Sequence, residues 1–135
     1  MNLHNGYELT TQIVEALQGA GLSIGRAVAP TTSTSQGYVV VYPLTGGTFD
    51  GAIDAPNSEA RASYQLTSVS ASAQQCEWLA DKARRTLVAA DLTLTDRGVV
   101  RIDPVFMGGV MREDDGGGAP LFYSPERFTV WTDAA

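Results

Sequence analysis

The chain has 135 residues and is 44% hydrophobic, which suits one domain with its own core and excludes wholesale disorder. Its formal net charge of -6 at pH 7 argues against a dedicated nucleic-acid-binding domain, since such domains carry a basic stripe. A single cysteine, Cys76, leaves no partner for an intramolecular disulfide, and no apolar run is long enough to span a bilayer. With no signal-peptide pattern at residues 1–6, the sequence predicts a soluble product of the cytoplasm.

Two segments carry the three- and four-residue spacing of apolar side chains that is typical of amphipathic helices. The first is 7–20, with Asn5 as its N-cap and Glu8 placed to complete a capping box. The second begins after Ser72, has Gln75 in the same position, and runs to about residue 89. The core stripe that we expect on this second helix is Cys76, Leu79, Ala80, Ala83 and Leu87.

Runs of β-branched and aromatic residues predict the strands. Residues 38–44 read as a buried strand that Pro43 ends, because proline has no N–H to donate. Residues 61–70 alternate weakly and are expected to pair antiparallel with 38–44. Residues 121–132 predict a further strand, in which Ser124-Pro125-Glu126 indicates a bulge or an edge position.

A hairpin is predicted between the second helix and the last strand. Residues 92–95 and 99–102 flank Asp96-Arg97-Gly98, and glycine there can take the positive φ of a tight turn. The element order is then helix, strand, long loop, strand, helix, hairpin, long loop, strand. This order predicts one α+β domain over 1–135, with a small, mostly antiparallel sheet and the two helices packed on one face.

Two stretches are rich in glycine: 45–60, which predicts a long loop or an open hairpin tip, and 108–120, which predicts a second long loop. Long loops in a compact domain are usually functional or disordered, and we expect these to contact partners. The predicted contact residues are Phe49, Ile53, Val110 and Met111. The same two stretches carry the acidic residues Asp50, Asp54, Glu113, Asp114 and Asp115.

Few residue patterns here suit catalysis. His4 is the single histidine, and Cys76 lies on the apolar stripe of a helix, where cysteines are usually inert. The chain has no phosphate-binding loop motif and too few thiols and imidazoles for a zinc site. The carboxylates of Glu113, Asp114 and Asp115 could ligate a hard cation, but consecutive residues rarely converge on one ion. We therefore predict a solvated acidic loop, with no catalytic, cofactor-binding or metal-binding residues.

Four segments resemble tail-terminator proteins of long-tailed, siphovirus-type bacteriophages of actinobacteria. They are Tyr38-Val-Val-Val-Tyr-Pro-Leu with the Gly-Gly-Thr-Phe-Asp-Gly that follows, Gln74-Gln-Cys-Glu-Trp-Leu-Ala-Asp-Lys-Ala-Arg, Met111-Arg-Glu-Asp-Asp, and Pro120-Leu-Phe-Tyr-Ser-Pro-Glu-Arg-Phe. The likeness covers nearly the whole chain, keeps the same element order, and contains no catalytic signature.

The resemblance implies a fold similar to that of the tail-tube subunit, a small sheet flanked by helices. It implies a ring, usually six-fold, at the head-proximal end of the tail tube in the virion. Such a ring stops tube polymerisation and joins the tail to the head-completion proteins. Genomic DNA would pass through its lumen without specific binding, and no cofactor or membrane would be involved. The acidic residues Asp50, Asp54, Glu113, Asp114 and Asp115 would then suit a surface that faces the DNA, because they repel its phosphates.

Two other functions stay open from the sequence. Head–tail connector or neck proteins of the same virions share the size and the α+β character. A small-ligand-binding or hydrolytic α+β domain that uses the acidic loop would need a concave pocket with converging polar groups.

Overall fold

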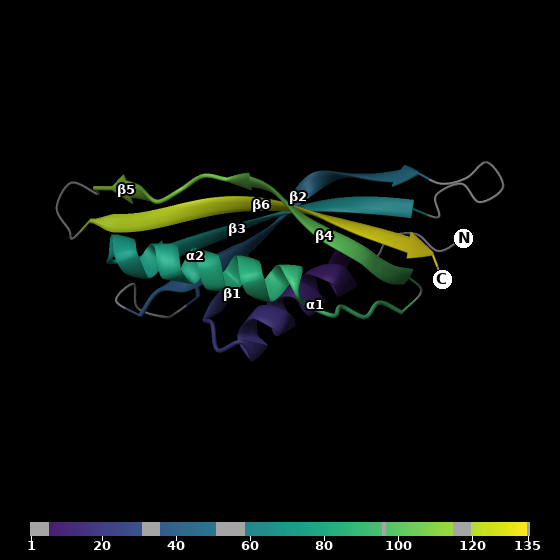
Figure 1. Cartoon of the computed structure of the whole chain (residues 1–135), viewed down its shortest axis with the longest axis horizontal. Helices are drawn as coiled ribbons and strands as arrows, with labels where there is room; N and C mark the ends of the chain where they lie inside the picture. Colours follow the sequence, from purple (N-terminus) through teal and green to yellow (C-terminus); the bar gives the residue numbers. More distant parts are fainter. Residues whose placement is uncertain (1–5, 31–35, 51–58, 96, 115–119, 135) are drawn as a thin grey trace.

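A computed structural model describes residues 6–30, 36–50, 59–95, 97–114 and 120–134 (Figure 1). Two helices and six strands follow one another in the chain. They are α1 (Gly6–Gly19), β1 (Ile24–Arg26), β2 (Tyr38–Asp50), β3 (Glu59–Ser70), α2 (Ala73–Val88), β4 (Arg97–Met107), β5 (Met111–Glu113) and β6 (Leu121–Ala134).

The strands form one mixed sheet in the order β1-β2-β3-β6-β4, with β5 also paired to β6. The β1–β2 pair is parallel and the other pairs are antiparallel. Both helices lie on the same face of this sheet (Figure 1). The predicted α+β class, with a mostly antiparallel sheet and two helices on one face, is confirmed. The short parallel strand β1 was not predicted.

The core lies between the helices and the sheet. The apolar stripe expected on the second helix is buried along its whole length, with Cys76 and Leu87 fully so. Across from the helices, β2, β3 and β6 contribute Val39, Tyr64 and Phe128. Each fully buried large side chain stabilises the fold by roughly 1.5–3 kcal/mol, so this layer holds the helices on the sheet.

The N-terminus of α2 keeps one half of the predicted capping box. Ser72 Oγ accepts a hydrogen bond from the Gln75 backbone N–H at 3.4 Å. The Gln75 side chain does not return to the Ser72 backbone, because its Oε1 accepts from Ser70 Oγ at 2.6 Å and its Nε2 donates to the Gln36 carbonyl at 2.9 Å. Ser70 Oγ instead accepts from the Ser72 N–H at 3.3 Å. The cap therefore ties α2 to the preceding strand and to the segment before β2.

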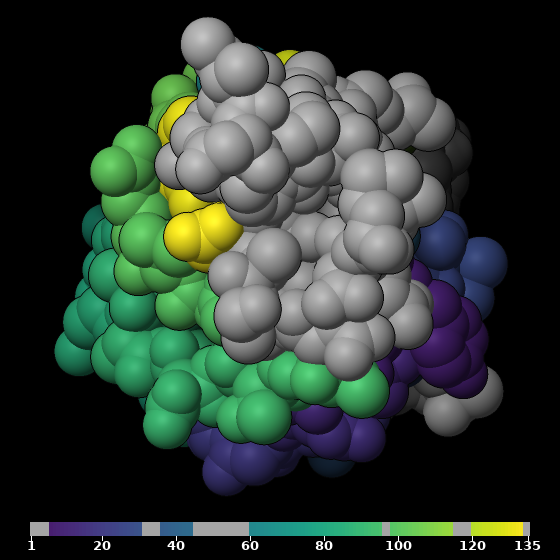
Figure 2. Space-filling model, turned by 90° about the vertical axis from the view of Figure 1, so that its right-hand side faces the viewer, coloured from purple at the N-terminus to yellow at the C-terminus, as the bar shows by residue number. Residues whose placement is uncertain are grey.

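A carboxylate of α1 anchors the segment that follows α2. Glu8 accepts hydrogen bonds from the backbone N–H and the hydroxyl of Thr95, both at 2.6 Å, and these bonds lower the pKa of Glu8. Its predicted capping partner, Asn5, lies outside the described residues. Figure 2 shows this end of the molecule, where the green segment after α2 adjoins the purple α1.

The predicted hairpin is largely wrong. Residues 92–95 form only one isolated bridge, Thr93 with Gly98, and β4 begins at Arg97. Leu92 and Leu94 are buried in the core, and Thr93 and Thr95 are exposed, but the segment forms no strand. Burial of both leucines, together with the Glu8–Thr95 bonds, holds the segment against the helices, which explains why it does not extend the sheet.

The predicted long loops are partly strand. Residues 45–50 continue β2, with Thr48, Phe49 and Asp50 opposite Arg61, Ala60 and Glu59, after an irregularity between Leu44 and Thr48. The glycines at 46 and 47 fall in that irregularity, where a bulge accommodates them. In the second loop, residues 111–113 form β5 on β6. The loop assignments of 45–50, 59–60 and 111–113 are therefore wrong, and 51–58 and 115–119 lie outside the described residues.

Pro43 does not end its strand. The Val39 N–H donates to the Ser23 carbonyl and the Val41 carbonyl accepts from the Ala27 N–H, so alternate residues of β2 direct their backbone groups toward β1. Pro43 continues this alternation, but the β1 pairing stops at Val41. The N–H that proline lacks would thus face a side with no paired strand, and pairing with β3 continues through Leu44.

Pro125 lies inside the sheet, so the predicted edge position is wrong. On one side it lies opposite Thr67 of β3, and on the other its carbonyl accepts from the Gly108 N–H at 2.8 Å. Because the N and O of one strand residue point the same way, the missing N–H of Pro125 also faces Gly108. The β4 pairing stops at Glu126 and the β5 pairing resumes at Tyr123. The irregularity predicted for β6 is therefore found in the neighbouring chain segment, where β4 ends and β5 begins.

We predict that Gly108→Ala lowers the free energy of unfolding by about 1–3 kcal/mol, as overpacking does in tight sites. A Cβ at Gly108 would lie 2.8 Å from Pro125 Cγ and 2.9 Å from the Pro125 carbonyl oxygen. The control is Gly98→Ala, because a Cβ at Gly98 meets nothing within 4 Å. It should leave stability unchanged or raise it by up to ~1 kcal/mol. Equal effects of the two substitutions in urea unfolding would contradict the packing described at Pro125.

Candidate functional site: a groove between α2 and the β4–β5 junction

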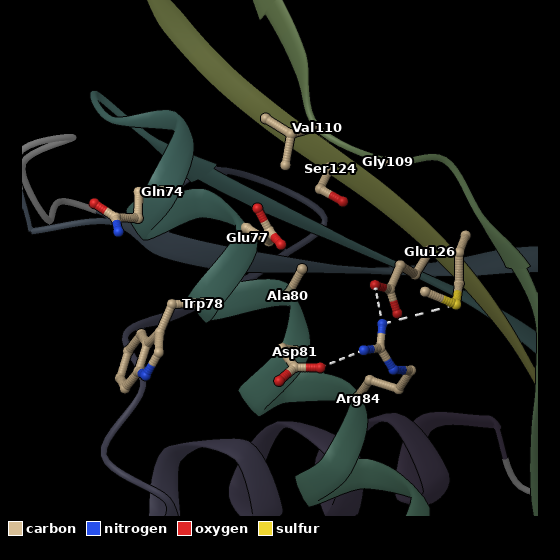
Figure 3. A pocket seen from close by; sticks show the side chains of 11 residues that line it. Gln74, Glu77, Trp78, Ala80, Asp81, Arg84, Gly109, Val110, Ser124 and Glu126 are labelled. Carbon is tan, nitrogen blue, oxygen red and sulfur yellow. Dashed lines mark hydrogen bonds and ion pairs between the residues drawn. The ribbon is translucent and has the colours of Figure 1, made fainter.

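An open groove of about 690 Å³ lies between one side of α2 and the place where β4 passes into β5 (Figure 3). Its lining comes from three elements and the β4–β5 junction. The residues are Gln74, Glu77, Trp78, Ala80, Asp81 and Arg84 of α2, Met107 of β4, Gly109 and Val110 of the junction, and Ser124 and Glu126 of β6. The groove therefore depends on the break in pairing opposite Pro125.

A buried carboxylate lies in this groove. Glu126 is 4% exposed, and its Oε1 accepts a hydrogen bond from Arg84 Nη1 at 2.7 Å. Its other oxygen, Oε2, is buried and has no hydrogen-bond partner among the described residues. Buried polar groups are nearly always paired, so an unpaired carboxylate oxygen requires an explanation.

Arg84 serves two carboxylates at once. Its Nη2 pairs with Asp81 on the same helix while Nη1 pairs with Glu126. Nη1 also lies 3.8 Å from Met107 Sδ, a weak acceptor (Figure 3). The remaining oxygen of Asp81 is 3.5 Å from Arg85 Nη2. One guanidinium thus links α2, β4 and β6 across the groove.

The groove is acidic despite Arg84. The lining residues include three carboxylates, Glu77, Asp81 and Glu126, and one guanidinium, which gives the lining a formal net charge of -2 when all are ionised. Arg85, outside the lining, offsets part of the charge of Asp81. Burial raises the pKa of Glu126, Arg84 opposes that rise, and the nearby Asp81 carboxylate adds to it. The ionised form of Glu126 is therefore stabilised incompletely by its surroundings.

Apolar side chains are exposed at the same place. Trp78 is 52% exposed, Met107 59% and Val110 36%. Together with the carboxylates they form a surface suited to an apolar and cationic partner. Among the described residues that line the groove there is no histidine or cysteine.

The sequence-predicted contact residues fall in different places. Val110 lines the groove, and Met111, at the start of β5, is 37% exposed. Phe49 is a strand residue opposite Ala60, in the part of the sheet that holds Thr132 and not Ser124. Ile53 lies outside the described residues. The position of Phe49 in the sheet is therefore separate from that of Val110 and Met111.

The predicted acidic residues are likewise separated. Glu113 and Asp114 are exposed at the end of β5, where Asp114 Oδ1 pairs with Arg112 Nε at 3.0 Å. Asp50 lies opposite Glu59, where β2 ends and β3 begins, on the other side of the sheet along the strand direction (Figure 1). Asp54 and Asp115 lie outside the described residues. The described part of the chain contains no group of three or more metal-ligating residues.

Cys76 behaves as a core residue. Its side chain is fully buried, its Sγ lies 3.4 Å from the Ser68 carbonyl oxygen, and burial raises its pKa to about 11. The thiol is thus protonated at neutral pH and a poor nucleophile, as its position on the helix stripe predicts. His4 lies outside the described residues.

The sheet face away from the helices carries arginines stacked on aromatic rings. Arg61 and Arg101 lie 5.1 Å and 4.6 Å from the ring centroid of Trp131, whose Nε1 donates to Asp103 Oδ2 at 3.1 Å. Arg127 lies 5.7 Å from the ring centroid of Phe106. We call these residues the arginine face.

Sequence reasoning missed both the groove and this face. Side chains of a strand alternate between its two faces, so Arg127 and Trp131 lie on the other face of β6 from the buried Phe128 and Val130. This alternation could have indicated the arginine face from the sequence. The apolar run Val105-Phe106-Met107 was a second signal. Nothing in the sequence indicates that these strands are neighbours.

No protein-family model matches this sequence, and no curated protein matches it. A virion chain has the same fold. It belongs to a solved structure described as the virion of a native gene transfer agent particle. The TM-score is 0.69 with 16% sequence identity, and the alignment covers 93% of this chain and 95% of that chain. Within the described residues, neither helix combines the length and apolarity needed to cross a membrane.

We predict that Glu126→Gln gains stability relative to the unchanged chain as pH rises from 4.5. The folded chain binds the Glu126 proton more tightly than the unfolded chain, so ionisation lowers the free energy of unfolding above that pH. Glutamine cannot ionise, so the difference between variant and parent should grow toward neutral pH in denaturant titrations.

Glu8→Gln is the matched control, because its stability relative to the parent should change with pH in the opposite direction. The lowered pKa of Glu8 means that its ionised form stabilises the fold, an effect lost at acid pH. Its variant should therefore lose stability relative to the parent toward neutral pH. If the stability of both variants relative to the parent changed in the same direction with pH, the electrostatic description of Glu126 would be refuted.

Proposed function

We propose that the chain is a virion structural protein, and specifically the tail terminator of a long-tailed bacteriophage. Copies of it form a ring, usually six-fold in such proteins, at the head-proximal end of the tail tube. The ring stops tube polymerisation and joins the tail to the head-completion proteins. The protein needs no catalytic residue and no cofactor for this role.

The observation that carries the proposal is the fold shared with a virion chain over nearly the full length of both chains. The described residues of the four segments that resemble tail terminators lie mainly in β2, α2, β5 and β6. The segments are therefore distributed over the fold that the chain shares with the virion chain. The fold likeness supports a virion role, and the segment resemblance supports the narrower terminator role. A neck protein is the nearest alternative.

The surface also suits assembly. Four large apolar side chains of the edge strand β4 are at least half exposed: Val100, Val105, Phe106 and Met107. An exposed apolar edge strand promotes association unless something covers it. A ring of identical subunits needs a heterologous contact, in which two different surfaces of the chain meet. The groove and the arginine face are two such surfaces.

The acidic residues suit a DNA channel by repelling phosphates, so that the genome slides through. Asp50 and Glu113 lie at opposite ends of the sheet, so both can face one channel only where the strands run along its axis. Phe49 and Ile53 remain predicted contacts with the tail tube or a neighbouring subunit.

We expect that phage lacking this protein make tails longer than normal, together with heads that carry no tail. Electron microscopy of the particles measures both. Loss of a neck protein would instead leave free tails of normal length. That result would contradict the terminator role and favour the neck-protein alternative. Unchanged particles would refute a virion role altogether.

We further expect that Asp114→Lys with Asp115→Lys lowers infectivity while rings still form, because the added cations retain phosphate groups in the channel. The control is Glu15→Lys with Asp91→Lys, which changes the net charge equally at exposed sites on α1 and after α2. Plaque counts and micrographs give the readouts. Equal infectivity of the two double variants would refute the channel position of this loop.

A further inference from the structure

The groove contains an acceptor that its own chain does not satisfy. Glu126 is buried, one of its oxygens has no partner among the described residues, and the groove carries excess negative charge. Arg84 is already shared between Asp81 and Glu126. A second cationic donor entering the groove would balance the charge that one guanidinium leaves.

The rim sets a second requirement on what enters. Trp78, Met107 and Val110 are exposed beside the carboxylates. In Figure 3 the short side chain of Ala80 lies on α2 between Glu77 and Asp81 and lines the groove. A partner that fits therefore carries an aromatic or aliphatic group next to its cation.

The chain itself presents cations next to aromatic groups on the arginine face, the side of its sheet away from the helices. Arg127 is exposed and stacks on Phe106, which is 50% exposed. Arg101 is also exposed; it stacks on Trp131, and its Nε donates to Asp103 Oδ2 at 2.8 Å, so Asp103 offsets part of the positive charge of this face. The chain has only nine lysines and arginines against fifteen acidic residues, and three of the nine lie on the arginine face. This concentration of cations is complementary to the acidic groove.

The two surfaces lie back to back across β4 and β6. Phe106 pairs with Arg127, while Met107, the next residue, pairs with Glu126 and lines the groove. Neighbouring strand residues point to opposite faces, so one copy can offer its arginine face while its groove receives another copy. Such a contact is heterologous and repeats, which gives a closed ring when the rotation closes.

We propose that the groove between α2 and the β4–β5 junction receives the arginine face of a second copy of this chain. Arg101 and Arg127 of one copy meet Glu77, Asp81 and Glu126 of the next, and Phe106 meets Trp78 and Val110. The inference takes from the proposed function only that copies of the chain assemble with each other. It identifies which two surfaces meet.

The test uses two variants that each remove one surface. The groove variant is Glu77→Arg with Val110→Arg, and the face variant is Arg101→Glu with Arg127→Glu. All four residues are exposed, so each variant should fold, as circular dichroism will check. The control is Arg26→Glu with Arg112→Glu, which makes the same charge change as the face variant at residues that belong to neither surface.

Analytical ultracentrifugation up to millimolar concentration in low salt gives the readout. The unchanged chain and the control should associate, and each surface variant alone should associate more than about tenfold more weakly, because close charge pairs at interfaces contribute well over 1.4 kcal/mol. An equimolar mixture of the two surface variants should form a heterodimer and nothing larger, since each retains only one surface.

Three results would overturn the inference. They are a monomeric unchanged chain under these conditions, association of either variant equal to the control, or no heterodimer in the mixture. The proposed function is judged separately, by tail length in phage that lack the protein. Abnormal tails combined with unaffected surface variants would leave the terminator role standing and place the subunit contact elsewhere.

Discussion

Pro125 imposes a constraint on the whole β4–β5 side of the molecule. It lies in β6, which is paired on both sides, and cannot donate to the strand that faces its nitrogen. The β4 pairing ends at Met107, and Gly108 then lies against Pro125 and donates to its carbonyl. Glycine has no Cβ, which permits this close contact with the proline ring and carbonyl. Pairing then resumes in β5. The interruption forms the wall of the groove and leaves Met107 and Val110 exposed.

A second consequence concerns charge. Glu126 follows Pro125 directly and points to the helix side of the sheet, where α2 covers it. A buried carboxylate is costly unless paired, and Arg84 reaches it from α2. That ion pair fastens α2 to the strand next to the interruption. The cost of burial is only partly offset, since the pKa of Glu126 remains raised.

The accuracy of sequence reasoning followed the range of the interactions. The stripe from Cys76 to Leu87 was predicted correctly because helical periodicity depends on neighbours three and four residues away. The glycines at 46 and 47 were read as a loop, whereas β2 passes through them by an irregularity that only pairing with β3 reveals. Likewise Pro125 indicated an irregular position, but whether β6 was an edge depended on strands distant in sequence. The groove was missed for the same reason, since its lining comes from 74–84, 107–110 and 124–126.

The distribution of charge bears on how such a chain can assemble with itself. At -6 per copy, approaching copies repel each other at long range. That repulsion is screened beyond about 8–10 Å at physiological ionic strength, whereas charges in contact are screened much less. Contact between the arginine face and the acidic groove would therefore attract only when the two surfaces are correctly aligned. An acidic chain with its cations gathered on one face thus favours the ordered contact over random aggregation, while its remaining surface keeps the assembly soluble.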